Sequence, residues 1–112
     1  MDKNEAHTHW DEAKPLRELS KALAGCNNPE LTEEFLHSLF TPAEVVEMGK
    51  RWALVRLLDE ELSQRNIARE LGLSLCKITR GSKELKKENS PFRRMIELYE
   101  EREKTRSEDE DE

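Results

Sequence analysis

The side chains best suited to chemistry in this 112-residue chain are basic and lie close together between Ser63 and Lys87. They are Arg65, Arg69, Lys77, Arg80, Lys83, Lys86 and Lys87. These seven basic residues stand against two acidic ones, although the whole chain has a formal net charge of −6. A local positive surface on an acidic protein is suited to specific contacts with phosphate groups at one face.

Two short helices joined by a tight turn must position these charges, within residues 63–86. Ser63 and Ser74 are suitable N-caps, and Gly72 can adopt the left-handed conformation that ends a helix. Apolar residues repeat at helical spacing in both halves: Ile67, Ala68 and Leu71, then Leu75, Ile78 and Leu85. This pattern predicts a helix-turn-helix, whose second helix enters the DNA major groove. A solvated helical hairpin in an unrelated bundle is the alternative.

Composition limits the fold and the function class. The chain is 35% hydrophobic and 39% charged, with a mean hydropathy of −0.93, so a lone monomer would have a thin core. No nucleophile–base pair, metal-ligand set or phosphate loop stands out, so we expect no enzyme activity, catalytic residue, metal or cofactor. The polar start and the lack of a long apolar run predict a cytoplasmic protein without a membrane segment.

A long helix after Thr41 is apolar on nearly all sides. Thr41 is a suitable N-cap, Pro42 fits the first helical position, and Glu44 completes a capping box. Residues 45–58 then carry apolar side chains around almost the whole circumference. Because a helix of this kind must be buried on all sides, the pattern indicates a partner chain.

The remaining sequence predicts further helices between charged ends. Residues 1–9 are predicted to be a disordered arm, residues 10–99 a helical domain that starts at Trp10, and residues 100–112 an acidic, mostly disordered tail. Helical spacing predicts one helix that ends at Gly25, one around residues 31–39 and one after Pro91. No stretch has strand character, so the fold class is all-α with about six helices.

With these features in place, the chain resembles the tryptophan operon repressor family. The resemblance covers about residues 10–99 and rests mainly on Ile78-Thr-Arg-Gly-Ser82, supported by Ser63-Gln-Arg65, Glu70-Leu-Gly72 and Phe40-Thr-Pro-Ala-Glu44. It implies an intertwined all-helical homodimer that represses genes of tryptophan biosynthesis or transport. Its implied partners are L-tryptophan, the corepressor, and double-stranded palindromic operator DNA.

The resemblance also implies a site for L-tryptophan. Arg51 and Arg80 match two arginines whose guanidinium planes sandwich the indole ring. Arg80 and the Thr41 hydroxyl group can meet the ligand carboxylate, free carbonyl groups near the end of the second helix can accept from the ammonium group, and Gly81 lets the backbone approach the ligand. The implied ligand residues are Thr41, Arg51, Arg80, Gly81, Ser38 and Phe40.

The same elements predict how DNA is contacted. Gln64 and Arg65 begin the first helix of the pair and should address phosphates, while the start of the second helix should face the bases. The candidate DNA-binding residues are Gln64, Arg65, Ser74, Leu75, Cys76, Lys77, Thr79 and Lys83. The family typically has small or neutral residues at positions 76 and 77, so the base preference is expected to differ.

One departure from the family pattern bears on the ligand site. Between Arg51 and Ser63 the chain is one residue shorter, and one residue in a helix is about 100° of rotation. Without a compensating loop shift or bulge, Arg51 and Arg80 would not face each other.

Two alternatives to a tryptophan-dependent repressor stay open. One is a related DNA-binding regulator that responds to another aromatic ligand or to none. The other is an interaction module whose basic face binds an acidic protein.

Overall fold

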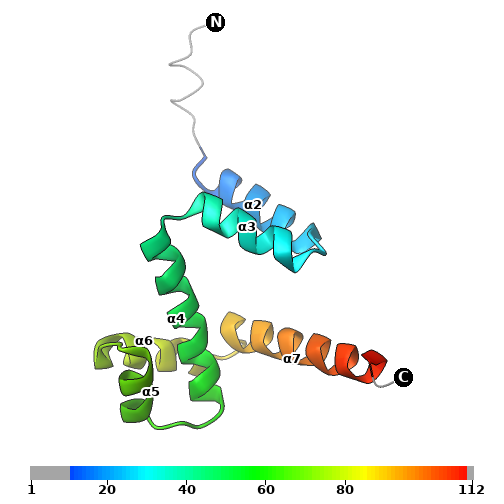
Figure 1. The fold of residues 1–112 in the computed structure, drawn as a ribbon. Helices are drawn as coiled ribbons and strands as arrows, with labels where there is room; N and C mark the ends of the chain where they lie inside the picture. Colours follow the sequence, from blue (N-terminus) through cyan, green and yellow to red (C-terminus); the bar gives the residue numbers. More distant parts are fainter. Residues whose placement is uncertain (1–10, 111–112) are drawn as a thin grey trace, which may run out of the picture. The chain divides into compact units, whose positions relative to one another are not determined.

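The computed structural model describes residues 11–110, and this range contains six helices and no strand (Figure 1). They are α2 (Ala13–Gly25), α3 (Pro29–Leu39), α4 (Pro42–Asp59), α5 (Gln64–Leu71), α6 (Leu75–Lys86) and α7 (Pro91–Glu110). The predicted all-α class with about six helices is confirmed, whereas the predicted arm at 1–9 and Trp10 lie outside the described residues. None of the described helices is long and apolar enough to cross a membrane. Two compact units make up the chain, Met1–Val45 and Val46–Glu112.

Local side-chain caps explain where α3 and α4 begin. Asn28 accepts a hydrogen bond from the N–H of Leu31 at 3.2 Å, and Pro29 opens α3. At α4 the N–H of Glu44 donates to Thr41 Oγ1 at 3.2 Å, and the N–H of Thr41 donates to Glu44 Oε1 at 2.9 Å. The bond from the Thr41 backbone N–H stabilises the charged carboxylate and lowers the pKa of Glu44. The predicted capping box is therefore present.

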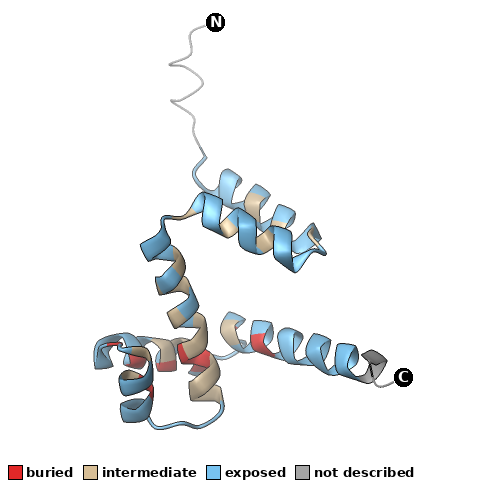
Figure 2. Cartoon of the chain, viewed as in Figure 1, coloured by how far each residue is buried: buried red, intermediate tan, exposed pale blue. Residues whose placement is uncertain are grey.

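The first unit exposes most of its apolar side chains. Neither α2 nor α3 has a buried residue, and Figure 2 shows both helices mainly in the colours of exposed and intermediate residues. Leu31 is 52% exposed and Leu39 is 48% exposed. Ala22, Leu23, Cys26, Leu31, Thr32 and Phe35, from both helices and their turn, line a shallow pocket of about 220 Å³. The two helices alone therefore do not bury a core.

The second unit contains the buried core of the described residues, in two clusters (Figure 2). The first cluster packs α4 against α5 and α6, and consists of Leu54, Ile67, Leu73 and Ile78. The second cluster packs α4 against α6 and α7, and consists of Val55, Leu85 and Ile96. The C-terminal half of α4 is thus the element on which the other three helices of this unit pack.

The sequence predicts that α4 is buried on nearly all sides, but fewer of its residues are buried within one chain. Only Leu54 and Val55 are buried, and Val46 is 57% exposed. Trp52 meets Tyr99 of α7 edge-on, with 6.3 Å between ring centroids. The apolar surface that remains is consistent with the prediction of a partner chain, which stays a prediction.

Helix α7 is longer than the sequence predicted. It continues to Glu110, although residues from 100 onward were expected to be mostly disordered. Its residues 101–107 are exposed, and Arg56 of α4 lies 3.7 Å from Glu100 at the start of this extension. The prediction treated the charged run as a solvated coil, whereas Glu, Lys and Arg are good helix formers, so the run continues as a solvated helix.

Candidate nucleic-acid interface and adjoining pocket

Residues 63–86 form two helices joined by a three-residue turn. Gly72 adopts φ 63°, the left-handed conformation that favours glycine, and ends α5. Leu73 then turns inward and is 8% exposed. Ser63 Oγ accepts from the N–H of Asn66 at 3.2 Å to begin α5, and the Ser74 hydroxyl caps α6 in the same way. The caps and the glycine turn lie where the sequence predicted them.

The predicted DNA-binding residues are all exposed. They are Gln64, Arg65, Ser74, Leu75, Cys76, Lys77, Thr79 and Lys83. On α6, Leu75, Thr79 and Lys83 follow one another at four-residue spacing and so share one outer face. The Thr79 hydroxyl donates to the carbonyl of Leu75 at 2.8 Å, which leaves its oxygen lone pairs free to accept.

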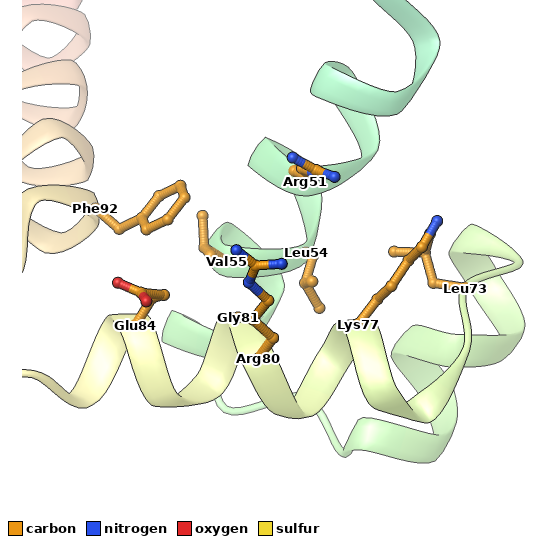
Figure 3. A pocket seen from close by; sticks show the side chains of 9 residues that line it. All are labelled: Arg51, Leu54, Val55, Leu73, Lys77, Arg80, Gly81, Glu84 and Phe92. Atoms are coloured by element: carbon orange, nitrogen blue, oxygen red, sulfur yellow. The ribbon is translucent and has the colours of Figure 1, made fainter. Parts of the chain in front are cut away.

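Lys77 differs from the other predicted DNA-binding residues. Its Nζ donates a hydrogen bond to Glu47 Oε1 of α4 at 2.8 Å, and its side chain lines the pocket between α4 and α6 (Figure 3). The sequence predicted that Lys77 would face the bases. Lys77 shares a helical face with Arg80 and Glu84 and not with Thr79, and its contact with bases stays a prediction.

A pocket of about 290 Å³ lies between α4 and α6, with one residue from α7. Its lining consists of Arg51, Leu54, Val55, Leu73, Lys77, Arg80, Gly81, Glu84 and Phe92. Figure 3 shows Lys77, Arg80 and Glu84 rising from α6 toward α4. The volume is near the lower end for small-molecule sites, which begins at roughly 300 Å³.

Arg51 and Arg80 both line this pocket, as the sequence predicted for a ligand site. Arg51 Nε lies 3.8 Å from Glu47 Oε1 and the side chain is 65% exposed. Arg80 is exposed and has no hydrogen bond or ion pair within residues 11–110. Between the end of α4 at Asp59 and the start of α5, the chain turns with Glu61 at φ 66°. The segment between Arg51 and Ser63, which is one residue shorter than in the family pattern, thus leaves the two arginines beside one pocket.

Gly81 has a packing role that the sequence did not predict. A Cβ atom added there would lie 2.9 Å from Leu54 Cδ2 and 3.3 Å from Leu54 Cγ. The absence of a side chain thus lets α6 approach α4 closely at the buried Leu54. The sequence analysis assigned this glycine to close approach of a ligand; Gly81 also lines the pocket, and its contact with a ligand stays a prediction.

The other implied ligand residues belong to the first unit and make local contacts there. The Ser38 hydroxyl donates to the carbonyl of Glu34 at 3.1 Å, and the N–H of Phe40 donates to the carbonyl of Leu36 at 3.0 Å. Thr41 Oγ1 acts as the cap of α4. Their contact with a ligand therefore remains a prediction.

Glu84 and Phe92 are among the pocket residues that the sequence analysis did not assign to a site. Glu84 accepts from Lys87 Nζ at 2.9 Å, and Phe92 also borders the second core cluster. Glu84 follows Arg80 by one helical turn, a spacing that could have placed it on the same face. Phe92 reaches the pocket only through the packing of α7. Among the described residues, no group of three or more His, Cys, Asp or Glu could hold a metal ion.

Positive charge beside the pocket stabilises the carboxylate of Glu47. The hydrogen bond from Lys77 is the main cause that lowers the pKa of Glu47, and the charges of Lys77, Arg51 and Lys50 act in the same direction. Glu47 is therefore shared by one cation on its own helix and one on α6.

Comparisons with known proteins agree with this arrangement. The model of the family described as Trp repressor protein matches residues 14–100. A Trp operon repressor homolog of Chlamydia caviae is 38% identical over 69 residues, which cover 61% of this chain and 68% of that protein. A Trp operon repressor homolog of Vibrio campbellii is 35% identical over 80 residues, which cover 70% of this chain and 80% of that protein. The crystal structure of a TrpR-like protein from Eubacterium eligens has a similar fold, with a TM-score of 0.70 and 20% identity over 79% of this chain and 91% of that chain.

Proposed function

The chain belongs to the Trp repressor family, and from this premise we propose that it is a DNA-binding transcriptional repressor with L-tryptophan as its corepressor. One observation carries the proposal: Arg51 of α4 and Arg80 of α6 line one pocket, while α6 exposes Thr79 and Lys83 on another face. A single helix therefore adjoins both the proposed ligand site and the proposed DNA surface.

The chemistry of the pocket fits a planar aromatic acid. Guanidinium groups stack on aromatic rings and pair with carboxylates, so Arg51 and Arg80 can hold both parts of such a ligand. Leu54 and Val55 give the pocket an apolar floor for the ring. Because Arg80 has no partner within the described residues, binding there does not require an existing ion pair to break.

We propose that the N-terminal parts of α5 and α6, which are exposed, contact the DNA. Arg65, in the first turn of α5, contacts phosphates, and Leu75, Cys76 and Thr79 on α6 meet the edges of bases. In a two-fold symmetric dimer, two recognition helices reach successive major grooves roughly 34 Å apart, which requires a palindromic operator.

A homodimer is supported by the apolar side chains that this chain exposes. Val46, Met95 and Leu98 are 57%, 57% and 54% exposed. Leu31 and Leu39 of α3 are exposed as well, and the partner that we propose for these side chains is a second copy of the chain.

The test is DNA binding with and without L-tryptophan. An operator is first selected from a random library with the purified protein, and its affinity is then measured by fluorescence anisotropy. We expect tighter binding with L-tryptophan, and calorimetry is expected to show L-tryptophan binding to the protein alone, with indole-3-propionate and tyrosine as comparisons. Equal DNA affinity in both conditions would contradict the corepressor role.

A ligand-independent regulator is the second candidate, and one contact favours it. Lys77 joins α6 to α4 through its hydrogen bond with Glu47, a contact made by residues of the protein alone. This contact can hold the recognition helix beside α4 without a corepressor. Strong operator binding that L-tryptophan leaves unchanged would support this candidate.

A further inference from the structure

We infer that a second pocket of the protein binds a small phosphorylated polyol, a molecule with a phosphate monoester and several hydroxyl groups. This pocket has a volume of about 610 Å³ and is formed by the end of α4, the turn after it, the start of α5, the end of α6 and the start of α7. Seven of its ten lining residues are polar or charged, which favours a hydrophilic ligand. It shares no lining residue with the pocket of Arg51 and Arg80, so the inference goes beyond the corepressor site.

One polar side chain in this pocket lacks a partner. Ser82 of α6 lines the pocket, is 9% exposed, and makes no side-chain hydrogen bond within residues 11–110. A buried polar group without a partner is costly, and most such groups bond to protein, to water or to a ligand. Because a hydroxyl group both donates and accepts, Ser82 suits a ligand that is rich in oxygen atoms.

The start of α5 and the end of α6 provide donors for a phosphate group. The N–H of Ile67 donates to the carbonyl of Ser63 at 3.0 Å, whereas the N–H groups of Gln64 and Arg65 precede the helical bonds of α5. Ser63 and Gln64 line the pocket, and the positive end of the helix dipole favours an anion there. Lys86 of α6 also lines the pocket, is exposed, and has no ion pair within the described residues. These groups can together hold a phosphate group.

Two carboxylates in the lining favour a ligand that carries hydroxyl groups besides the phosphate. The Oδ1 atom of Asp59 accepts a hydrogen bond from Nη1 of Arg93 at 2.9 Å, so these two charges largely cancel. Glu61 has no ion pair within the part of the chain that the structure describes, and its charge repels a bare phosphate ion. Carboxylate oxygens accept hydrogen bonds, so Glu61 suits the hydroxyl groups of a ligand whose phosphate group lies toward Lys86.

The experiment titrates the purified full chain by calorimetry with glucose 6-phosphate, and with inorganic phosphate and glucose as comparisons. We expect wild type to bind glucose 6-phosphate more tightly than either comparison compound. Lys86→Gln should weaken this binding about tenfold, because it removes the cation that pairs with the phosphate. Ser82→Ala should weaken it about fivefold, because it removes one hydrogen bond.

A matched control and two further measurements accompany the variants. Lys104→Gln also removes one positive charge, but Lys104 is exposed on α7 and does not line the pocket, so wild-type affinity is expected. Melting temperatures verify that each variant is folded. L-tryptophan titrations of the same samples should be unchanged by Lys86→Gln and Ser82→Ala, because neither residue lines the pocket of Arg51 and Arg80.

The possible results separate this inference from its alternatives. Weaker binding of glucose 6-phosphate by Lys86→Gln and Ser82→Ala, with Lys104→Gln unchanged, supports it. Equal wild-type affinity for glucose 6-phosphate and inorganic phosphate, or an unchanged affinity in Lys86→Gln, overturns it. If glucose 6-phosphate does not bind while Lys86→Gln weakens DNA binding in anisotropy titrations, the pocket holds a phosphate group of DNA and the inference is wrong. Absence of L-tryptophan binding contradicts only the proposed corepressor.

Discussion

Lys77 Nζ donates a hydrogen bond to Glu47 Oε1 at 2.8 Å, and this contact joins α6 to α4 beside the pocket. The side chain of Lys77 is 51% exposed and that of Glu47 is 33% exposed. Exposed ion pairs contribute little to stability, so a phosphate group or a ligand can compete for Lys77. Binding of a ligand or of DNA can therefore replace the contact between Lys77 and Glu47.

The first prediction concerns this pair. Glu47→Gln removes the charge that holds Lys77, so we expect tighter non-specific DNA binding and a salt dependence steeper by about one unit in the log–log slope. Anisotropy titrations at several salt concentrations measure both quantities. Glu97→Gln, at an exposed position of α7, is the control for the loss of one negative charge. Equal slopes for the two variants would contradict a role of Glu47 in restraining Lys77.

The second prediction concerns acid stability. The pKa values of Glu44 and Glu47 are both lowered in the folded chain from an ordinary value of 4.5. A lowered folded pKa contributes stability above the unfolded pKa, and this contribution is lost as the pH falls through the folded value. We expect stability to decrease below pH 4.5. Urea unfolding as a function of pH should show a smaller decrease in stability for Glu44→Gln, which can still cap α4, than for wild type. Glu33→Gln, at an exposed position of α3, is the control and should behave as wild type does.

The helix boundaries could be predicted from the sequence because their causes are local. The capping box of Thr41 and Glu44 and the left-handed Gly72 each depend on residues within one turn. The pairing of Arg51 with Arg80 came from resemblance to a family, because these residues are far apart in the chain. It could not have been obtained from spacing alone.

What the sequence missed depends on how the helices pack. Gly81 contacts Leu54 only because α6 crosses α4 at that point, and Phe92 reaches the pocket only because α7 returns to it. The hydrogen bond of Lys77 with Glu47 on α4 was likewise not predicted, while its predicted contact with DNA stays a prediction. Contacts of this kind are tertiary and leave no periodic pattern in the sequence.

The third prediction is an obligate dimer. Leu31 and Leu39 of α3, Val46 of α4 and Met95 of α7 are between 48% and 57% exposed. We propose that a second chain covers these side chains, so sedimentation at low micromolar concentration should show one species with the mass of a dimer. We expect Met95→Glu to shift the equilibrium toward monomer or to prevent folding. A stable, folded wild-type monomer at that concentration is the result that would exclude the model.

The fourth prediction separates phosphate contacts from base contacts. Arg65→Ala should weaken binding to all sequences alike and reduce the salt slope by about one, because a phosphate contact carries no sequence information. Thr79→Ala should change the preferred operator and leave the slope unchanged. Library selection followed by salt titration measures both effects, and Arg94→Ala on α7 controls for the loss of one exposed arginine. If Arg65→Ala altered base preference as well, α5 would not be the phosphate-contacting helix.

The last prediction couples the two sites through Arg80. This residue belongs to α6, the proposed recognition helix, lines the pocket and has no hydrogen bond or ion pair within the described residues. A ligand shifts DNA affinity only if it binds the DNA-competent arrangement of α6 more tightly than the other arrangement. Linkage then requires operator DNA to raise the affinity for L-tryptophan by the same factor by which L-tryptophan raises the affinity for DNA.

We therefore expect Arg80→Ala to lose both L-tryptophan binding and the L-tryptophan dependence of operator binding, while non-specific DNA binding persists. The fold should survive, because no hydrogen bond or ion pair within the described residues is removed. Arg51→Ala should have the same effect on ligand binding, although it also loses the 3.8 Å contact with Glu47. Calorimetry with and without operator gives one coupling factor, and anisotropy with and without L-tryptophan gives the other. Unequal factors in wild type would mean that the two measurements do not report one shared equilibrium, and an unchanged ligand response in Arg80→Ala would place the coupling elsewhere.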